Sequence, residues 1–190
     1  MVKCYDWEDT LMNAEQYRAV IGWFNARPAA KKALRLVSRG AVGLVYLLYL
    51  GMLAWLALHH SEQLLPAVIV PAAAFLVGTL VRRVIDRPRP YTALGVAPLF
   101  PKDKTGQSMP SRHCFSAAAI AGAAWFVFRP LGIVLAVLGV LIAVCRVVTG
   151  VHYISDVLAG LAFGAAFAVL GWNAFVLAAS ALGFYSIMLL

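Results

Sequence analysis

Charge is scarce in this 190-residue chain, and negative charge is the scarcest kind. Asp and Glu number 8 against 16 Lys and Arg, and charged residues make up only 13% of the sequence. Hydrophobic residues reach 63% and the mean hydropathy is +0.84, which is too apolar for an ordinary soluble domain of this size. The composition therefore excludes a typical soluble protein and predicts a polytopic membrane protein.

Cysteines and carboxylate clusters are also sparse. The three cysteines, Cys4, Cys114 and Cys145, are odd in number and show neither a disulfide framework nor metal-ligand spacing. No group of carboxylates in the sequence is suited to hold magnesium or calcium. We therefore expect no metal and no cofactor.

The positive balance, +8 with an isoelectric point near 9.8, raises the question of a nucleic-acid partner. No aromatic stacking platform or major-groove motif accompanies it in the sequence. We assign the charge to membrane topology and phosphate capture, and expect no nucleic-acid partner.

Six near-continuous apolar runs predict six transmembrane helices. Most runs are slightly shorter than the roughly 20 residues that cross hydrocarbon, so flanking turns are expected to extend them. Short connections at Arg129-Pro130 and at Gly171 predict antiparallel neighbours. We expect an all-α, polytopic membrane helical bundle over residues 41–190, with the oligomeric state left open. The runs cover residues 41–58, 64–81, 114–128, 131–148, 157–170 and 172–190.

Small residues are frequent in the last two runs. Such residues let two helices approach closely, and lipid-facing alanines are an equally open alternative. The residues concerned are Gly160, Gly164, Ala165, Ala166 and Ala168.

Residues 1–40 form a separate interfacial segment in this interpretation. Ala14, Tyr17, Ile21 and Phe24 recur at helical spacing and predict an amphipathic helix. This helix either lies along the membrane surface or packs against the bundle. A basic stretch follows and leads into the first span. It consists of Lys31, Lys32, Arg35 and Arg39.

Charge counting predicts which way the bundle faces. With two spans before the long connection 82–112, the N-terminus, that connection and the region of His152 share one side of the membrane. Arg129 is then the only Lys or Arg on the opposite side. The positive-inside rule places the richer side in the cytoplasm. We therefore expect a multi-pass protein of the cell membrane with its active site on the cytoplasmic face.

Three polar residues, Arg146, His152 and Asp156, interrupt an apolar stretch in which charges need a reason. A helix that restarts near His152 would place Asp156 one turn along on the same face. The carboxylate would then fix the imidazole tautomer and stabilise the imidazolium, as a nucleophilic histidine requires. The guanidinium of Arg146 is suited to bind an anionic substrate.

The connection 82–112 is long for a compact bundle, and such loops are usually functional. Pro88 and Pro90 predict that the preceding helix ends near residues 86–87. At the far end of the connection, Ser111 begins a helix whose free N–H groups and dipole favour an anion. His113 would lie beside that anion.

These clusters are expected to converge, because the third and fourth spans form a hairpin that returns the chain to the same side. The resulting set contains several arginines, two histidines, a serine at a helix start and one aspartate. This inventory suits metal-independent phosphoryl transfer, in which arginines and backbone amides carry the charge of the equatorial oxygens.

The same residues resemble the motifs of the type 2 phosphatidic acid phosphatase superfamily, which includes membrane lipid phosphatases and soluble vanadium haloperoxidases. The first motif, lysine, six residues, then Arg-Pro, is similar to Arg82 through Arg89-Pro90. The second, Pro-Ser-Gly-His, is similar to Pro110-Ser111-Arg112-His113. The third, Ser-Arg, five residues, His, three residues, Asp, resembles Cys145-Arg146, His152 and Asp156. Arginine, arginine and cysteine stand here in place of the lysine, the glycine and the serine.

The resemblance implies a role for each matching residue. His152 would be the nucleophile that forms a phosphohistidine, Asp156 its orienting partner and His113 the general acid. Arg87 has no counterpart in the motifs and is a further candidate contact to the headgroup. The phosphate-binding residues would be Arg82, Arg89, Ser111 and Arg146, with Arg112 joining the headgroup contact.

The expected function is that of a membrane-embedded phosphatase that hydrolyses a lipid phosphate or diphosphate, of prenyl or glycerolipid type, at the bilayer surface. One alternative is a lipid phosphotransferase with an acceptor other than water. Another is a non-catalytic binder or transporter of anionic lipids, although the pairing of His152 with Asp156 argues against simple binding. A haloperoxidase would share the oxyanion pocket, but an embedded bundle disfavours it.

Overall fold

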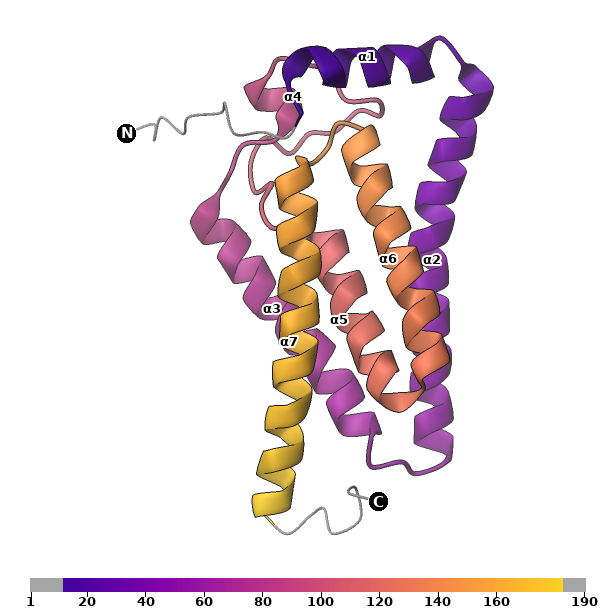
Figure 1. Ribbon diagram of the computed structural model, residues 1–190, viewed down its shortest axis with the longest axis vertical. Helices are drawn as coiled ribbons and strands as arrows, with labels where there is room; N and C mark the ends of the chain where they lie inside the picture. The colour runs from indigo at the N-terminus through magenta and orange to yellow at the C-terminus, as the bar shows by residue number, and fades with distance from the viewer. Residues whose placement is uncertain (1–11, 183–190) are drawn as a thin grey trace.

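Seven helices and no strand make up residues 12–182, the part of the chain that the computed structural model describes. The long helices run side by side along the vertical axis of the molecule, and α1 lies across one end of them (Figure 1). The helices are α1 (Ala14–Asn25), α2 (Pro28–Leu58), α3 (Leu64–Ile85), α4 (Pro90–Ala93), α5 (Arg112–Val127), α6 (Arg129–Val148) and α7 (Ile154–Ala181). The expected all-helical bundle is confirmed.

Within the described residues, four segments are long and apolar enough to cross a membrane, namely α2, α6, α7 and the stretch Leu64–Ala93 that holds α3 and α4. The helix between them, α5, has 16 residues and is shorter than a typical span. Large apolar side chains such as Leu47, Leu76 and Leu170 are exposed on the outside of the bundle. A lipid environment would bury these side chains, so the chain is an integral membrane protein.

The predicted count of six transmembrane helices is not confirmed, and the predicted break at Gly171 is wrong. α7 continues through Gly171 from Ile154 to Ala181. A single glycine costs a helix only about 1 kcal/mol, and no proline or polar cluster follows it to end the helix. The last eight residues of the predicted span 172–190 lie outside the described residues.

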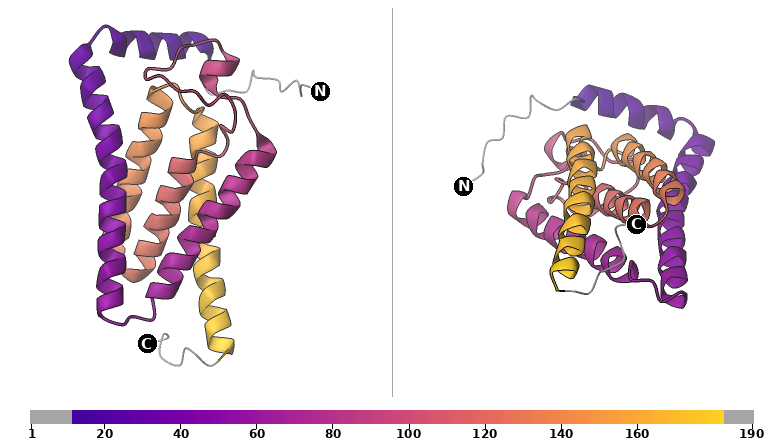
Figure 2. Two further views of the ribbon diagram at one scale, coloured as in Figure 1. Left: turned by 180° about the vertical axis from the view of Figure 1, so that it is seen from behind. Right: turned by 60° about the horizontal axis from the view of Figure 1, so that its bottom comes forward.

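The central helix of the bundle is α5, which packs against α3, α6 and α7 (Figure 2). Its contact with α7 is close because glycines of α7 face it: a Cβ atom on Gly160 would come within 2.8 Å of the Ser111 carbonyl oxygen. Gly164 likewise faces the Phe115 carbonyl. The expected close helix contact is therefore confirmed for these glycines, whereas Ala165 is exposed.

The amphipathic helix α1 packs against the loops at one end of the bundle. Tyr17 and Ile21 on its apolar face are buried and form a cluster with Val96, Leu99 and Tyr153. An Asn13 capping box begins the helix. Packing against the bundle, one of the two alternatives for this helix, is thus present in the structure.

We predict that Gly164→Ala destabilises the protein. The added Cβ would clash with the backbone of α5, and separating two packed helices should lower the free energy of unfolding by about 1–3 kcal/mol. Gly51→Ala is the matched control, because nothing lies within 4 Å of the Cβ position at this exposed helical glycine. Thermal unfolding in detergent measures both variants. Equal melting temperatures would contradict the assignment of Gly164 to the helix contact.

Candidate active site

Three distant segments of the chain meet at the end of the bundle that carries α1. They are the end of α3 with the residues that lead into α4, the end of the α4–α5 loop with the beginning of α5, and the turn between α6 and α7 (Figure 1). The prolines end α3 where expected, since α3 stops at Ile85 and Asp86 caps it with a positive φ of 39°. The hairpin of α5 and α6 then returns the chain to the same end, as predicted.

His152 lies at the centre of this region and is 3% exposed. Its Nδ1 atom is 3.3 Å from Ser108 Oγ and 3.5 Å from Asp156 Oδ2. The Ser108 hydroxyl in turn donates a hydrogen bond of 2.5 Å to Asp156 Oδ2. Because a carboxylate only accepts hydrogen bonds, this arrangement favours the tautomer with a proton on Nδ1. The Nε2 lone pair of His152 is then available for chemistry.

Asp156 is fully buried and has several donors around its carboxylate. The backbone N–H of Tyr153 donates to Oδ2 at 3.0 Å, and Arg87 Nη1 forms an ion pair with Oδ1 at 2.9 Å. The predicted pairing of His152 with Asp156 is therefore present. The buried carboxylate is compensated by one cation and by hydrogen bonds, as a buried charge requires.

Arg87 does not fit the expected role of a headgroup contact. Besides Asp156, its Nη1 donates to Ser155 Oγ at 2.8 Å, and its guanidinium lies 4.2 Å from the centre of the Tyr153 ring. The physical reason is the nearby buried carboxylate, which attracts the closest available guanidinium. Arg87 thus braces the carboxylate behind His152.

Arg82 and Arg89 are both buried and hold the loop that precedes α5. Arg82 Nη1 donates to the Pro110 carbonyl at 2.6 Å, and its Nη2 donates to the carbonyl of Gln107. Arg89 Nε donates to the Gly106 carbonyl at 3.1 Å. A guanidinium has five N–H donors, so each arginine keeps donors for a ligand after binding the loop.

Ser111 is the N-cap residue of α5, as expected, and its backbone N–H bonds to the start of α7. Its N–H donates to the Asp156 carbonyl at 2.9 Å. Its hydroxyl is buried and has no hydrogen-bond partner among the described residues, and the same holds for Arg146 Nε. Of the two residues, only Arg146 also lines the cavity at the predicted anion site.

A cavity of about 420 Å³ opens beside these groups. The two imidazoles, His113 and His152, line it together, so they face one space. Ser111 and Asp156 do not line the cavity and support it from behind. The cationic residues that line it are Arg82, Arg89, Lys102, Lys104, Arg112 and Arg146.

Burial in this region lowers the pKa of His152 below its usual value of 6.5. The neighbouring charges of Arg89 and Arg82 lower it further, while Asp156 opposes the shift by favouring the imidazolium. The lowered pKa keeps His152 neutral at physiological pH, which is the form that can attack an electrophile.

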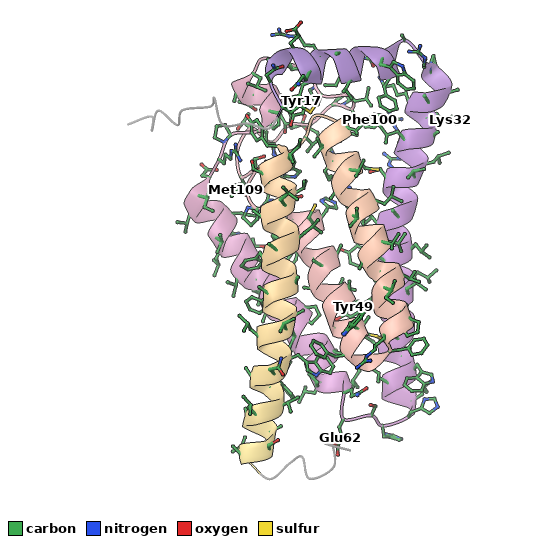
Figure 3. All side chains as sticks on the ribbon, viewed as in Figure 1. Tyr17, Lys32, Tyr49, Glu62, Phe100 and Met109 are labelled. Atoms are coloured by element: carbon green, nitrogen blue, oxygen red, sulfur yellow. The ribbon has the colours of Figure 1, made fainter. Side chains whose placement is uncertain are left out.

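Sequence reasoning missed two residues of the site, Ser108 and Tyr17. Ser108 bridges His152 and Asp156, although it lies more than forty positions before either of them. Tyr17 of α1 donates to the His152 carbonyl at 3.1 Å. Its only signal in the sequence was its place on the apolar face of an amphipathic helix. Tyr17 and Met109 lie toward the same end of the bundle, opposite Glu62 (Figure 3).

Comparison with known proteins connects this geometry to a family. The chain is 29% identical over 150 residues to the undecaprenyl-diphosphatase BcrC of Bacillus subtilis. The aligned region covers 79% of this chain and 77% of that protein. It is 35% identical over 100 residues to the lipid A 1-phosphatase of Rhizobium johnstonii. This aligned region covers 50% of this chain and 41% of that protein.

Solved structures share the fold at low sequence identity. LpxE of Aquifex aeolicus has a TM-score of 0.67 and 24% identity, over 88% of this chain and 98% of that one. A transmembrane PAP2-type phosphatidylglycerolphosphate phosphatase from Bacillus subtilis has a TM-score of 0.64 and 21% identity, over 86% of each chain. The family model of the PAP2 superfamily matches residues 63–180, well over half of the sequence and including every predicted site residue. The chain therefore belongs to the PAP2 superfamily.

Proposed function

We propose that this protein is a membrane-embedded phosphatase that hydrolyses a lipid phosphate or diphosphate by way of a phosphohistidine. The observation that carries the proposal is that His113 and His152 line one cavity together with four arginines. The relatives named lipid phosphatases and diphosphatases support the substrate class. The cavity lies at the end of apolar helices, so a lipid can keep its tail in the bilayer while its headgroup reaches the arginines.

The first step transfers the phosphoryl group to the protein. His152 Nε2 attacks phosphorus and forms a P–N bond, while the bond from phosphorus to the leaving oxygen breaks and His113 protonates that oxygen. Asp156 and Ser108 hold the Nδ1 proton and stabilise the imidazolium that develops. Burial and the charge of Arg146 lower the pKa of His113 to about 3 in the absence of substrate, and a bound phosphate dianion opposes this shift because it favours the imidazolium.

In the second step, His113 takes a proton from water, the water oxygen attacks phosphorus, and the P–N bond breaks to release phosphate. Arg82, Arg89 and Arg146 face the equatorial oxygens, where the transition state spreads its charge. The cationic cavity, the paired imidazoles and the family match support this route, for which the chain's own residues supply all the proton transfers.

The membrane side on which the cavity opens stays a prediction from charge counting. Seven of the cations on the richer side belong to the site or its support, namely Arg82, Arg87, Arg89, Lys102, Lys104, Arg112 and Arg146. The remaining cations on that side, including the basic stretch at the start of α2, still favour the cytoplasm by the positive-inside rule.

We predict that His152→Ala lowers the rate of phosphate release by about three or more powers of ten, because it removes the nucleophile. Binding of the lipid should be largely kept, since the arginines remain. Released phosphate, measured in detergent with a panel of lipid phosphates and diphosphates, provides the test. His59→Ala at the opposite end of the bundle should behave like the unmodified protein. Undiminished hydrolysis in the His152 variant would eliminate the mechanism.

We also predict the position of the acid limb of the pH profile. Protonation of His152 blocks attack, and its pKa lies below 6.5, so kcat/KM should fall with decreasing pH only in a range below 6.5. The profile should be recorded with two lipid substrates whose phosphates differ in pKa. A limb that belongs to His152 stays in place between them, and a limb at or above 6.5 would contradict the lowered pKa.

Ser108→Ala should lower kcat by about tenfold and leave KM nearly unchanged, because Ser108 positions His152 without lining the cavity. Steady-state kinetics and the melting temperature are the measurements. Ser180→Ala is the matched control, since the exposed Ser180 hydroxyl donates to the Val176 carbonyl of its own helix and lies far along α7 from the imidazole. A rise in KM with constant kcat would show that Ser108 acts on substrate binding instead.

A further inference from the structure

A second basic cavity, of about 480 Å³, lies beside the first and is lined in part by α2. Arg35, Ser38 and Arg39 of α2 form one wall, and Phe100 contributes another. The two cavities adjoin because they share Pro101, Lys102, His113, Arg146 and Val151. His113 and Arg146 therefore stand at the boundary between two cationic spaces.

Among residues 12–182, no Asp or Glu lines the second cavity. Within the same residues, neither Arg35 nor Arg39 forms a salt bridge. The two arginines are four positions apart on one helix, where like charges repel. Arg35 is also held in place, with its guanidinium 4.4 Å from the centre of the Phe100 ring. Such a concentration of positive charge is suited to an anionic ligand.

A third cavity, of about 300 Å³, is largely apolar and leads away from the same histidine. Arg112 and His113 stand at its polar end, and Val42 is common to this cavity and the second one. Its apolar walls come from four helices. They include Val45 and Tyr46 of α2, Phe75 of α3, Ile120 of α5 and Ile142 of α6.

We propose that the second cavity binds a second phosphoryl group, so that the protein acts on lipid diphosphates in preference to monophosphates. The inference rests on the proposed phosphatase function and names its substrate class. The terminal phosphoryl group would lie in the first cavity against His152 and the inner one in the second against Arg35 and Arg39. The bridging oxygen would then lie at His113, and the lipid tail would follow the third cavity.

Hydrolysis of a diphosphate would use both cavities, one for the phosphoryl group that is transferred and one for the phosphoryl group that leaves. His152 Nε2 forms a bond to the terminal phosphorus, and the bond from that phosphorus to the bridging oxygen breaks. The leaving group is the lipid monophosphate, with its bridging oxygen protonated by His113. Negative charge builds up on the inner phosphoryl group during this step, where Arg35, Arg39 and Lys102 stabilise it. A lipid monophosphate carries no group in the second cavity and receives no such stabilisation.

The test compares two substrates with the same tail, a prenyl diphosphate and the corresponding prenyl monophosphate, in detergent. The double variant R35Q/R39Q should lower kcat/KM for the diphosphate by about 10- to 100-fold and change that for the monophosphate by less than about threefold. The matched control K32Q/R83Q removes two exposed cations that line none of the three cavities. It should leave both substrates unaffected and thereby exclude a general effect of charge.

The single variant R39Q keeps the contact of Arg35 with Phe100 and covers the case in which the double variant unfolds. It should show a smaller loss that is still selective for the diphosphate. Equal losses on both substrates, or no loss on the diphosphate, would overturn the second phosphoryl site while leaving the phosphatase function intact. Failure of the unmodified protein to hydrolyse either substrate would overturn the proposed function and this inference with it.

Discussion

A single buried carboxylate ties the functional end of this protein together. Asp156 takes hydrogen bonds from the loop before α5 through Ser108, from its own helix start through Tyr153, and an ion pair from Arg87. Its backbone carbonyl accepts from Ser111 at the start of α5. An ion that is removed from water is costly unless every partner is in place. The segments that donate to Asp156 are thereby held in one arrangement, and His152 is positioned as a result.

The helical bundle provides a rigid base for this network. Gly160 and Gly164 allow α5 and α7 to lie against each other, which brings the beginnings of both helices to the same place. His113 is the second residue of α5, and His152 lies in the short turn that leads into α7, so the packing of α5 against α7 brings the two imidazoles together. Precise placement of the reacting groups is what a group-transfer site requires.

The sequence was sufficient to predict the helical class, the hairpin that returns the chain and six of the residues that line the cavity, whereas Ser111 and Asp156 lie behind it. Those predictions rested on hydrophobic runs, prolines and fixed spacings, which are local properties. It was not sufficient for Ser108 or Tyr17, because their roles come from contacts across the fold and neither lies in a distinctive pattern. The ion pair of Arg87 with Asp156 was not predicted, because it depends on which guanidinium lies closest to the carboxylate after folding. The break predicted at Gly171 is absent because a single glycine with apolar neighbours on both sides does not end a helix.

The hydrogen bond from Tyr17 to the main chain of His152 links residues 135 positions apart. Tyr17 precedes residues 63–180, the stretch that the family shares. Removing α1 would leave the carbonyl of His152 without this donor, and would uncover Val96 and Leu99 in the loop before α5. The working unit of this enzyme is consequently larger than its family signature, and a fragment trimmed to the shared stretch would contain every motif yet lack part of the scaffold that makes them act together.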